Sequence, residues 1–134
     1  MSVSHPAPKG TTPLQVLVVC PRGEYLDTVR GLTRHWLSGA ELHWTADPAV
    51  ALQRAHQAAP ALAILDARID RACGRALSRE LTLARADLDV MSFDDRGVSS
   101  VRSRHSTWHW SELPRAISWW MQRHMQAATP IRYQ

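Results

Sequence analysis

The sequence predicts an α/β fold, with a doubly wound sheet of five parallel strands between layers of helices. Short apolar runs, most of them β-branched or small residues, alternate along the chain with longer segments whose apolar residues recur at helical spacing. The apolar runs are too continuous for strands with one face in water, and they are typical of parallel strands buried on both faces. Strands that alternate with helices form right-handed βαβ units, which place helices on both faces of the sheet.

The composition is that of one globular domain. The chain has 134 residues, of which 45% are hydrophobic and 21% are charged, and this is enough for a single core. The net charge of +4 and the pI of about 9.8 would suit an acidic partner or nucleic acid. We find no signal peptide and no apolar run of membrane-spanning length. Because two cysteines form no disulfide framework, we expect a cytoplasmic protein.

The chain divides into a folded region and two tails. Residues 1–13 are rich in Pro, Ser, Thr and Gly, and we expect a flexible tail there. Residues 14–126 form the predicted domain, and residues 127–134 form a short C-terminal tail. We therefore expect no output domain after it, so that any effect passes through a partner.

Five segments have the pattern of strands. The most apolar is Ala-Leu-Ala-Ile-Leu-Asp, which ends abruptly in the carboxylate of Asp66. Open α/β sheets place their sites outside the carboxyl ends of their strands, so Asp66 is the first candidate site residue. The predicted strands are residues 14–19, 41–45, 61–66, 87–91 and 107–110.

Four segments have the pattern of helices, namely residues 24–37, 48–59, 74–86 and 111–128. Asp47-Pro48 is a strong helix start, with an N-cap acid before proline at the first helical position. We expect Ser111 to cap the last helix, with Pro114 in its first turn. Residues 92–106 are polar and predict only a short or irregular fourth helix between the last two strands.

In this order the segments resemble the receiver domain of response regulators, across roughly residues 14–125. The matching segments are Val16–Val19, Ala46–Leu52, Pro60–Asp66 and Gly74–Leu77. The resemblance implies a flavodoxin/CheY-like (βα)5 three-layer sandwich and a bacterial two-component signalling role. It also implies that Asp66 stands at the phospho-acceptor position.

Receivers phosphorylate this aspartate with the help of a set of neighbours. An acidic pair after the first strand holds Mg²⁺, and a Thr or Ser after the fourth strand bonds the phosphate. In this chain the acidic-pair positions fall on Cys20 and Pro21, and neither is a hard oxygen ligand. Ser92 matches the Thr or Ser position. The resemblance therefore implies an acceptor without its metal site.

Receivers also carry a lysine after the fifth strand, which pairs with the phosphate. That position falls near Ser111 or Glu112, and the only lysine of the chain is Lys9. Arg104 or Arg115 could supply a charge instead. Without Mg²⁺ or the lysine, little offsets the repulsion between a phosphoryl group and an anionic nucleophile. We therefore predict a degenerate pseudo-receiver.

Asp66 also has a structural interpretation, which we favour over phosphorylation. Its carboxylate could cap the following loop or pair with Arg68 or Arg22. Glu24, Asp94 and Asp95 could supply displaced metal ligands, but we interpret them as solvated loop acids.

We expect no metal, no cofactor and no enzymatic activity. The seven histidines lack zinc-site spacing, and we find no Gly-rich phosphate loop or nucleophile motif. Cys20 and Cys73 could form a redox-sensing disulfide only if their Cα atoms lie within about 7 Å, and we favour two unrelated cysteines.

Tryptophans are dense near the C-terminus, at Trp108, Trp110, Trp119 and Trp120. Adjacent helical residues lie about 100° apart, so we do not expect both Trp119 and Trp120 to be fully buried. An exposed tryptophan marks a candidate interface, and the last strand and helix of receivers commonly form one. We assign these four residues to an interface with a protein partner or a second copy of the chain.

The first functional hypothesis is a stand-alone regulatory module that acts by protein–protein interaction, independently of Mg²⁺-dependent phosphorylation. Its partner would be a sensor kinase, a transcription regulator or another effector. The first alternative is a receiver phosphorylated on Asp66, and the second is a nucleic-acid-binding regulator. The second would use Arg96, Arg102 and Arg104, which we prefer to interpret as part of a solvated loop. We expect no membrane partner.

Overall fold

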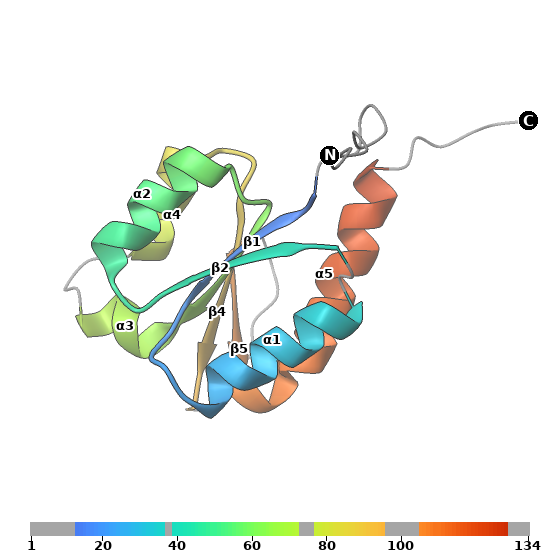
Figure 1. Cartoon of the computed structure of the whole chain (residues 1–134), viewed down its shortest axis with the longest axis horizontal. Helices are drawn as coiled ribbons and strands as arrows, with labels where there is room; N and C mark the ends of the chain where they lie inside the picture. The colour runs from blue at the N-terminus through green and yellow to red at the C-terminus, as the bar shows by residue number, and fades with distance from the viewer. Residues whose placement is uncertain (1–12, 37–38, 73–76, 96–104, 129–134) are drawn as a thin grey trace, which may run out of the picture.

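The structure is a computed structural model that describes residues 13–36, 39–72, 77–95 and 105–128. Five strands form one parallel sheet in the order β2-β1-β3-β4-β5, with β3 at its centre (Figure 1). The strands are β1 Gln15–Val19, β2 Glu41–Thr45, β3 Leu62–Asp66, β4 Asp89–Asp94 and β5 His105–His109. The predicted α/β fold with five parallel strands is confirmed.

Helices cover both faces of this sheet. They are α1 Glu24–Trp36, α2 Pro48–Ala58, α3 Ala67–Ala72, α4 Leu77–Ala84 and α5 Leu113–Ala128, with a 3₁₀ turn at Trp110–Glu112 before α5. Figure 1 shows α1 and α5 side by side on one face and α2 and α4 together on the other. This is the three-layer arrangement that the alternating pattern predicts.

Two apolar clusters, one on each face, follow from the alternation of side chains along the strands. Ile64 of β3 lies in the cluster beneath α1 and α5, and its neighbours Ala63 and Leu65 lie in the cluster beneath α2 and α4. All five residues of β3 are buried. Because both faces of this strand are covered, its sequence has no polar residue before Asp66.

Several element boundaries differ from the prediction, and one of them is the last strand, which is β5 His105–His109 instead of residues 107–110. The helix α3 starts directly after Asp66, although its polar sequence predicts a loop. The strand β4 spans Asp89–Asp94 instead of residues 87–91, because Ser92 and Asp94 are buried within the sheet despite their polarity. The predicted helix over residues 74–86 is α4, Leu77–Ala84. The two predicted tails fall largely outside the described residues, as does the segment 96–104 that would hold the irregular fourth helix.

The helix starts show which caps the sequence identifies correctly. Asp47 caps α2 as predicted, since its carboxylate accepts a hydrogen bond of 2.9 Å from the Ala49 N–H. At the last helix the predicted cap Ser111 is wrong. His109 caps the 3₁₀ turn that leads into α5, and Glu112 accepts a hydrogen bond from the His109 N–H in return. Among the described helices, none has the length and apolarity needed to cross a membrane.

Candidate functional site

Asp66 ends the central strand, and its side chain is fully buried. Both of its carboxylate oxygens accept hydrogen bonds from Arg68. The Arg68 backbone N–H donates to Oδ1 at 2.8 Å, the Nε–H donates to Oδ1 at 3.2 Å, and the Nη2 group donates to Oδ2 at 2.8 Å. The predicted structural role of Asp66, with Arg68 as the partner, is confirmed.

This bonding explains why α3 begins where it does. Asp66 precedes the first helical residue, and its carboxylate accepts the N–H of the second, which is the pattern of an N-cap. The negative charge also lies at the positive end of the helix dipole. The fork of the Arg68 guanidinium matches both carboxylate oxygens, an arrangement that gives the strongest protein ion pairs.

The Arg68 guanidinium keeps its positive charge at physiological pH. The hydrogen bond and negative charge of Asp66 raise the pKa of Arg68 above its already high ordinary value. The Arg68 side chain is 48% exposed, so the guanidinium remains in contact with water while the carboxylate is shielded from it. Water therefore contacts the Arg68 guanidinium and does not contact the Asp66 carboxylate.

The residues that follow β1 form the next part of the site. Cys20 is fully buried, its N–H donates to the Thr45 carbonyl at 3.2 Å, and its carbonyl accepts from the Trp44 indole N–H at 2.8 Å. Burial and the negative charge of Asp66 raise the pKa of the Cys20 thiol to about 11. At neutral pH the two acidic-pair positions therefore present a neutral thiol at Cys20 and an exposed proline ring at Pro21.

The end of β4 differs from the prediction for Ser92. We expected Ser92 just past this strand, but it lies inside β4 and is paired in register with Leu65. The register partner of Asp66 is Phe93. Because successive side chains of a strand point to opposite faces, Ser92 leaves the sheet on the face opposite to that of Phe93. The strand itself ends at Asp94.

An aromatic cluster lies beside the Asp66–Arg68 pair, and two of its members, Tyr25 and Phe93, were not singled out by the sequence. Tyr25 stacks on Trp110, with ring centroids 4.3 Å apart and planes at 7°, and Phe93 stacks on Trp110 at 4.9 Å. The Arg68 guanidinium lies 5.9 Å from the centroid of the Tyr25 ring. The Tyr25 hydroxyl donates a hydrogen bond to Asp95, and this bond raises the pKa of Tyr25.

The strand β5 ends at His109, just before Ser111 and Glu112, where a receiver would carry its lysine. His109 is the last residue of β5 and the register partner of Asp94. Its Nδ1 accepts the Ser111 N–H at 3.0 Å, so this nitrogen serves the helix cap. Arg115 lies 3.9 Å from a Glu112 carboxylate oxygen, and Arg104 lies outside the described residues.

The residues present do not fit a magnesium site of the receiver type. Mg²⁺ needs several oxygen ligands in octahedral geometry. Cys20 and Pro21 supply none from their side chains, and both oxygens of Asp66 are bound by Arg68. Within the described residues, no group of three or more His, Cys, Asp or Glu side chains is placed to hold a metal ion. Glu24, Asp94 and Asp95 therefore do not form the displaced site considered above.

Three of the four tryptophans assigned to an interface belong to the core. Trp108 and Trp110 are 5% exposed, and Trp120 is 2% exposed and donates its indole N–H to Asp89 at 2.8 Å. They are buried because α5 covers this side of the sheet, where β5 would otherwise expose them. Trp119 is half-buried and packs on Trp108 at 5.9 Å. The expectation that Trp119 and Trp120 are not both fully buried is confirmed.

The comparisons with known proteins concern the fold. No family model matches the chain, and no curated protein matches it. Among solved structures, the chain is similar to one described as a two component transcriptional regulator AraC from Clostridium phytofermentans, with a TM-score of 0.65 and 21% sequence identity. The similarity covers 87% of this chain and 99% of that one. At this identity the likeness shows a shared fold, and it agrees with the flavodoxin/CheY-like architecture.

We predict that Arg68→Ala lowers the free energy of unfolding by about 1–3 kcal/mol, because it leaves a buried carboxylate with a single backbone donor. Asp66→Asn combined with Arg68→Ala should lose less, since a neutral amide oxygen can still cap α3. Urea denaturation measures both variants. Arg79→Ala, which removes an exposed arginine of α4, is the control and should change stability by less than about 0.5 kcal/mol. Equal stability of Arg68→Ala and Arg79→Ala would contradict the prediction.

The raised pKa of Cys20 predicts how stability depends on alkaline pH. The folded protein holds the thiol proton more tightly than the unfolded chain, whose cysteines have the ordinary pKa of 9.0. The stabilisation from Cys20 is therefore complete below pH 9 and is lost as the pH rises toward about 11. Denaturation curves across this range should decline more steeply for the wild type than for Cys20→Ala. Parallel curves would show that the thiol pKa is not raised.

Proposed function

We propose that the chain is an atypical receiver-type signalling module, which acts by binding another protein and is not controlled by Mg²⁺-dependent phosphorylation of Asp66. Under this proposal the chain is not an enzyme. The observation that carries the proposal is the bonding of both Asp66 carboxylate oxygens by Arg68. The shared fold with a two-component regulator supports the receiver type.

The Asp66–Arg68 pair opposes phosphorylation in a direct way. An attacking carboxylate oxygen must be free to approach phosphorus, but each oxygen of Asp66 already accepts a hydrogen bond from a guanidinium that does not deprotonate. Breaking the pair would leave a buried carboxylate without its counter-charge, which is costly. The thiol and proline at the acidic-pair positions supply no metal ligand that would offset this cost.

Arg68 also supplies the positive charge that a metal ion would otherwise supply beside the Asp66 carboxylate. The carboxylate is neutralised by a residue of the same chain, so its surroundings stay the same whether or not a phosphodonor is present. A module of this kind transmits information through the partner that it binds. Control then comes from the amount of the module or of its partner.

The partly exposed surface of α5 around Trp119 is the partner surface that we propose. Trp119 is half-buried there, and the Arg123 guanidinium lies 5.0 Å above its ring. A tryptophan covered by arginine combines the two residue types that dominate the energetics of protein interfaces. Met121 is also partly exposed on this helix. The partner is a second copy of the chain, or else a sensor kinase, transcription regulator or other effector.

The phosphorylation part of the proposal is tested by titration with Mg²⁺ and beryllofluoride, followed in ¹H–¹⁵N NMR spectra. We expect no shift of the amide signals of Asp66 and its neighbours, because no carboxylate oxygen is free to bind the analogue. A variant that restores an acidic pair and frees Asp66 (Cys20→Asp, Pro21→Asp, Arg68→Ala) is the comparison, and it should gain shifts if its spectrum remains that of a folded protein. Wild-type shifts clustered around Asp66 and Ser92 would support the alternative, a phosphorylatable receiver.

The partner surface is tested by sedimentation equilibrium at increasing protein concentration. We expect the wild type to self-associate and Trp119→Glu to stay monomeric, since a buried glutamate would oppose contact between two α5 surfaces. Leu83→Glu is the matched control, because Leu83 is 76% exposed on α4, on the other face of the sheet, and should leave self-association unchanged. A wild type that stays monomeric would exclude the homodimer and leave a different protein as the partner.

A further inference from the structure

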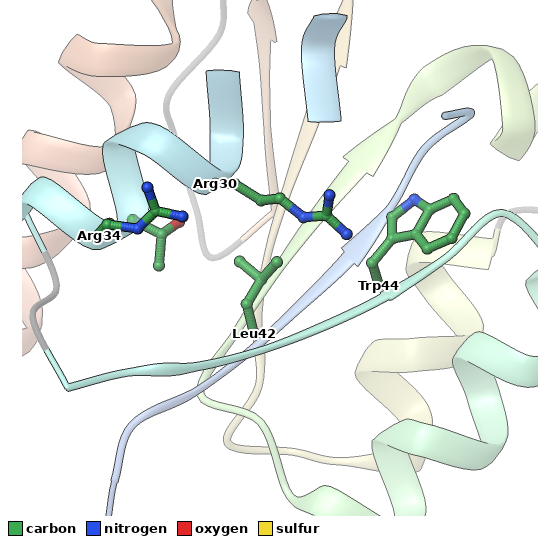
Figure 2. A pocket seen from close by; sticks show the side chains of 5 residues that line it. Arg30, Arg34, Leu42 and Trp44 are labelled. Carbon is green, nitrogen blue, oxygen red and sulfur yellow. The ribbon is translucent and has the colours of Figure 1, made fainter. Parts of the chain in front are cut away.

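A hollow between α1 and β2 has no part in the site described above. It is lined by Arg30, Thr33 and Arg34 of α1 and by Leu42 and Trp44 of β2, and its volume is about 400 Å³ (Figure 2). This volume lies within the range of pockets that bind small organic molecules. The lining places cationic groups on the helix side and apolar groups on the strand side.

The two arginines give the helix side of the hollow a positive charge. Arg30 and Arg34 are four residues apart on α1, so their side chains lie on the same face of the helix. Within the described part of the chain, neither guanidinium has a hydrogen bond or an ion pair. Figure 2 shows Arg30 reaching toward Trp44, with Arg34 at the opposite end and Leu42 between them. Two neighbouring unpaired cations favour the binding of an anion.

Thr33 supplies a second, independent observation. Thr33 lines the hollow although it is only 4% exposed, and among the residues that the structure describes its buried hydroxyl has no hydrogen-bond partner. Buried polar groups in native proteins nearly always have a partner. The Thr33 hydroxyl therefore has donor and acceptor capacity left for a polar group that enters the hollow beside Arg30 and Arg34.

The strand side of the hollow offers a flat apolar wall. Leu42 and Trp44 are both half-buried, and the indole N–H of Trp44 is bonded to the Cys20 carbonyl at 2.8 Å, which fixes the plane of the ring. The Arg22 guanidinium lies 5.3 Å from the centroid of the Trp44 ring and adds a third positive charge beside the hollow. A rigid indole next to leucine favours contact with a planar unsaturated group.

We propose that this hollow binds a small organic anion, whose phosphate or carboxylate oxygens bind Arg30 and Arg34 and whose planar ring packs against Leu42 and Trp44. Guanidinium groups bind both phosphate and carboxylate in the same forked geometry, so the two anions share this recognition. The Thr33 hydroxyl completes the polar side. The proposal does not depend on the state of Asp66 or on the α5 surface.

The test is a set of NMR titrations with four probes, in which the indole N–H signal of Trp44 monitors binding. The loss of one signal in Trp44→Phe assigns it among the indole signals of the six tryptophans. Adenosine 5′-monophosphate and indole-3-carboxylate carry a ring and an anion, adenosine carries a ring alone, and inorganic phosphate carries an anion alone. We expect at least one ring-bearing anion to bind at least about tenfold more tightly than both partial probes, since only it contacts both sides of the hollow. Comparison of the first two probes shows whether phosphate or carboxylate is preferred. Equal binding of a partial probe, or no shift of Trp44 with either ring-bearing anion, would overturn the proposal.

Variants assign the binding to the named residues. Arg30→Gln combined with Arg34→Gln should weaken binding of the preferred probe by at least about tenfold, and Arg79→Gln on α4 should leave it unchanged. Thr33→Val should weaken binding without lowering the stability of the free protein, because the hydroxyl has no hydrogen bond to lose. Binding that survives loss of both Arg30 and Arg34 would place the ligand elsewhere and overturn the proposal.

Discussion

A carboxylate buried at the end of the central strand is the constraint on which the rest of this structure depends. Asp66 has no contact with water, so its negative charge needs a partner within the protein. Arg68 supplies the partner from only two residues further along the chain. The same contact caps α3, so it also determines where this helix starts. One ion pair therefore both neutralises the buried carboxylate and sets the backbone path after β3.

The parts of the fold that the sequence predicts are those determined by local periodicity. The strand over residues 41–45 and the start of α1 at Glu24 were predicted at the observed positions, because alternation and helical spacing are properties of neighbouring residues. The helix α3 could not be predicted in this way, because its polar residues resemble a loop and its start depends on the Asp66 cap. The extent of β4 was also underestimated, since Ser92 and Asp94 are polar residues that only the assembled sheet buries.

The candidate site shows the same limit at the level of single residues. The sequence named both Arg68 and Arg22 as partners for Asp66, and only the geometry places Arg22 over Trp44 instead. The strand β4 ends three residues later than predicted, at Asp94 instead of residue 91, so the predicted phosphate-site residue lies inside the strand, and the alternation of faces turns Ser92 away from Asp66. The dense tryptophans are equally compatible with a core and with an interface, and the packing of α5 over β5 decides that Trp108, Trp110 and Trp120 belong to the core.

The helix α1 connects the site to the hollow. Its first turn carries Tyr25, which stacks on Trp110 beside the Asp66–Arg68 pair, and its later turns carry the arginines of the hollow. A ligand can shift an equilibrium only between states that it binds with different affinity. Under the proposed function Arg68 holds Asp66 in one state, so an anion in the hollow would have no second state of Asp66 to select. Any effect of such an anion would therefore arise at the surface of α1 and β2 itself, which is separate from the α5 surface proposed for the partner protein.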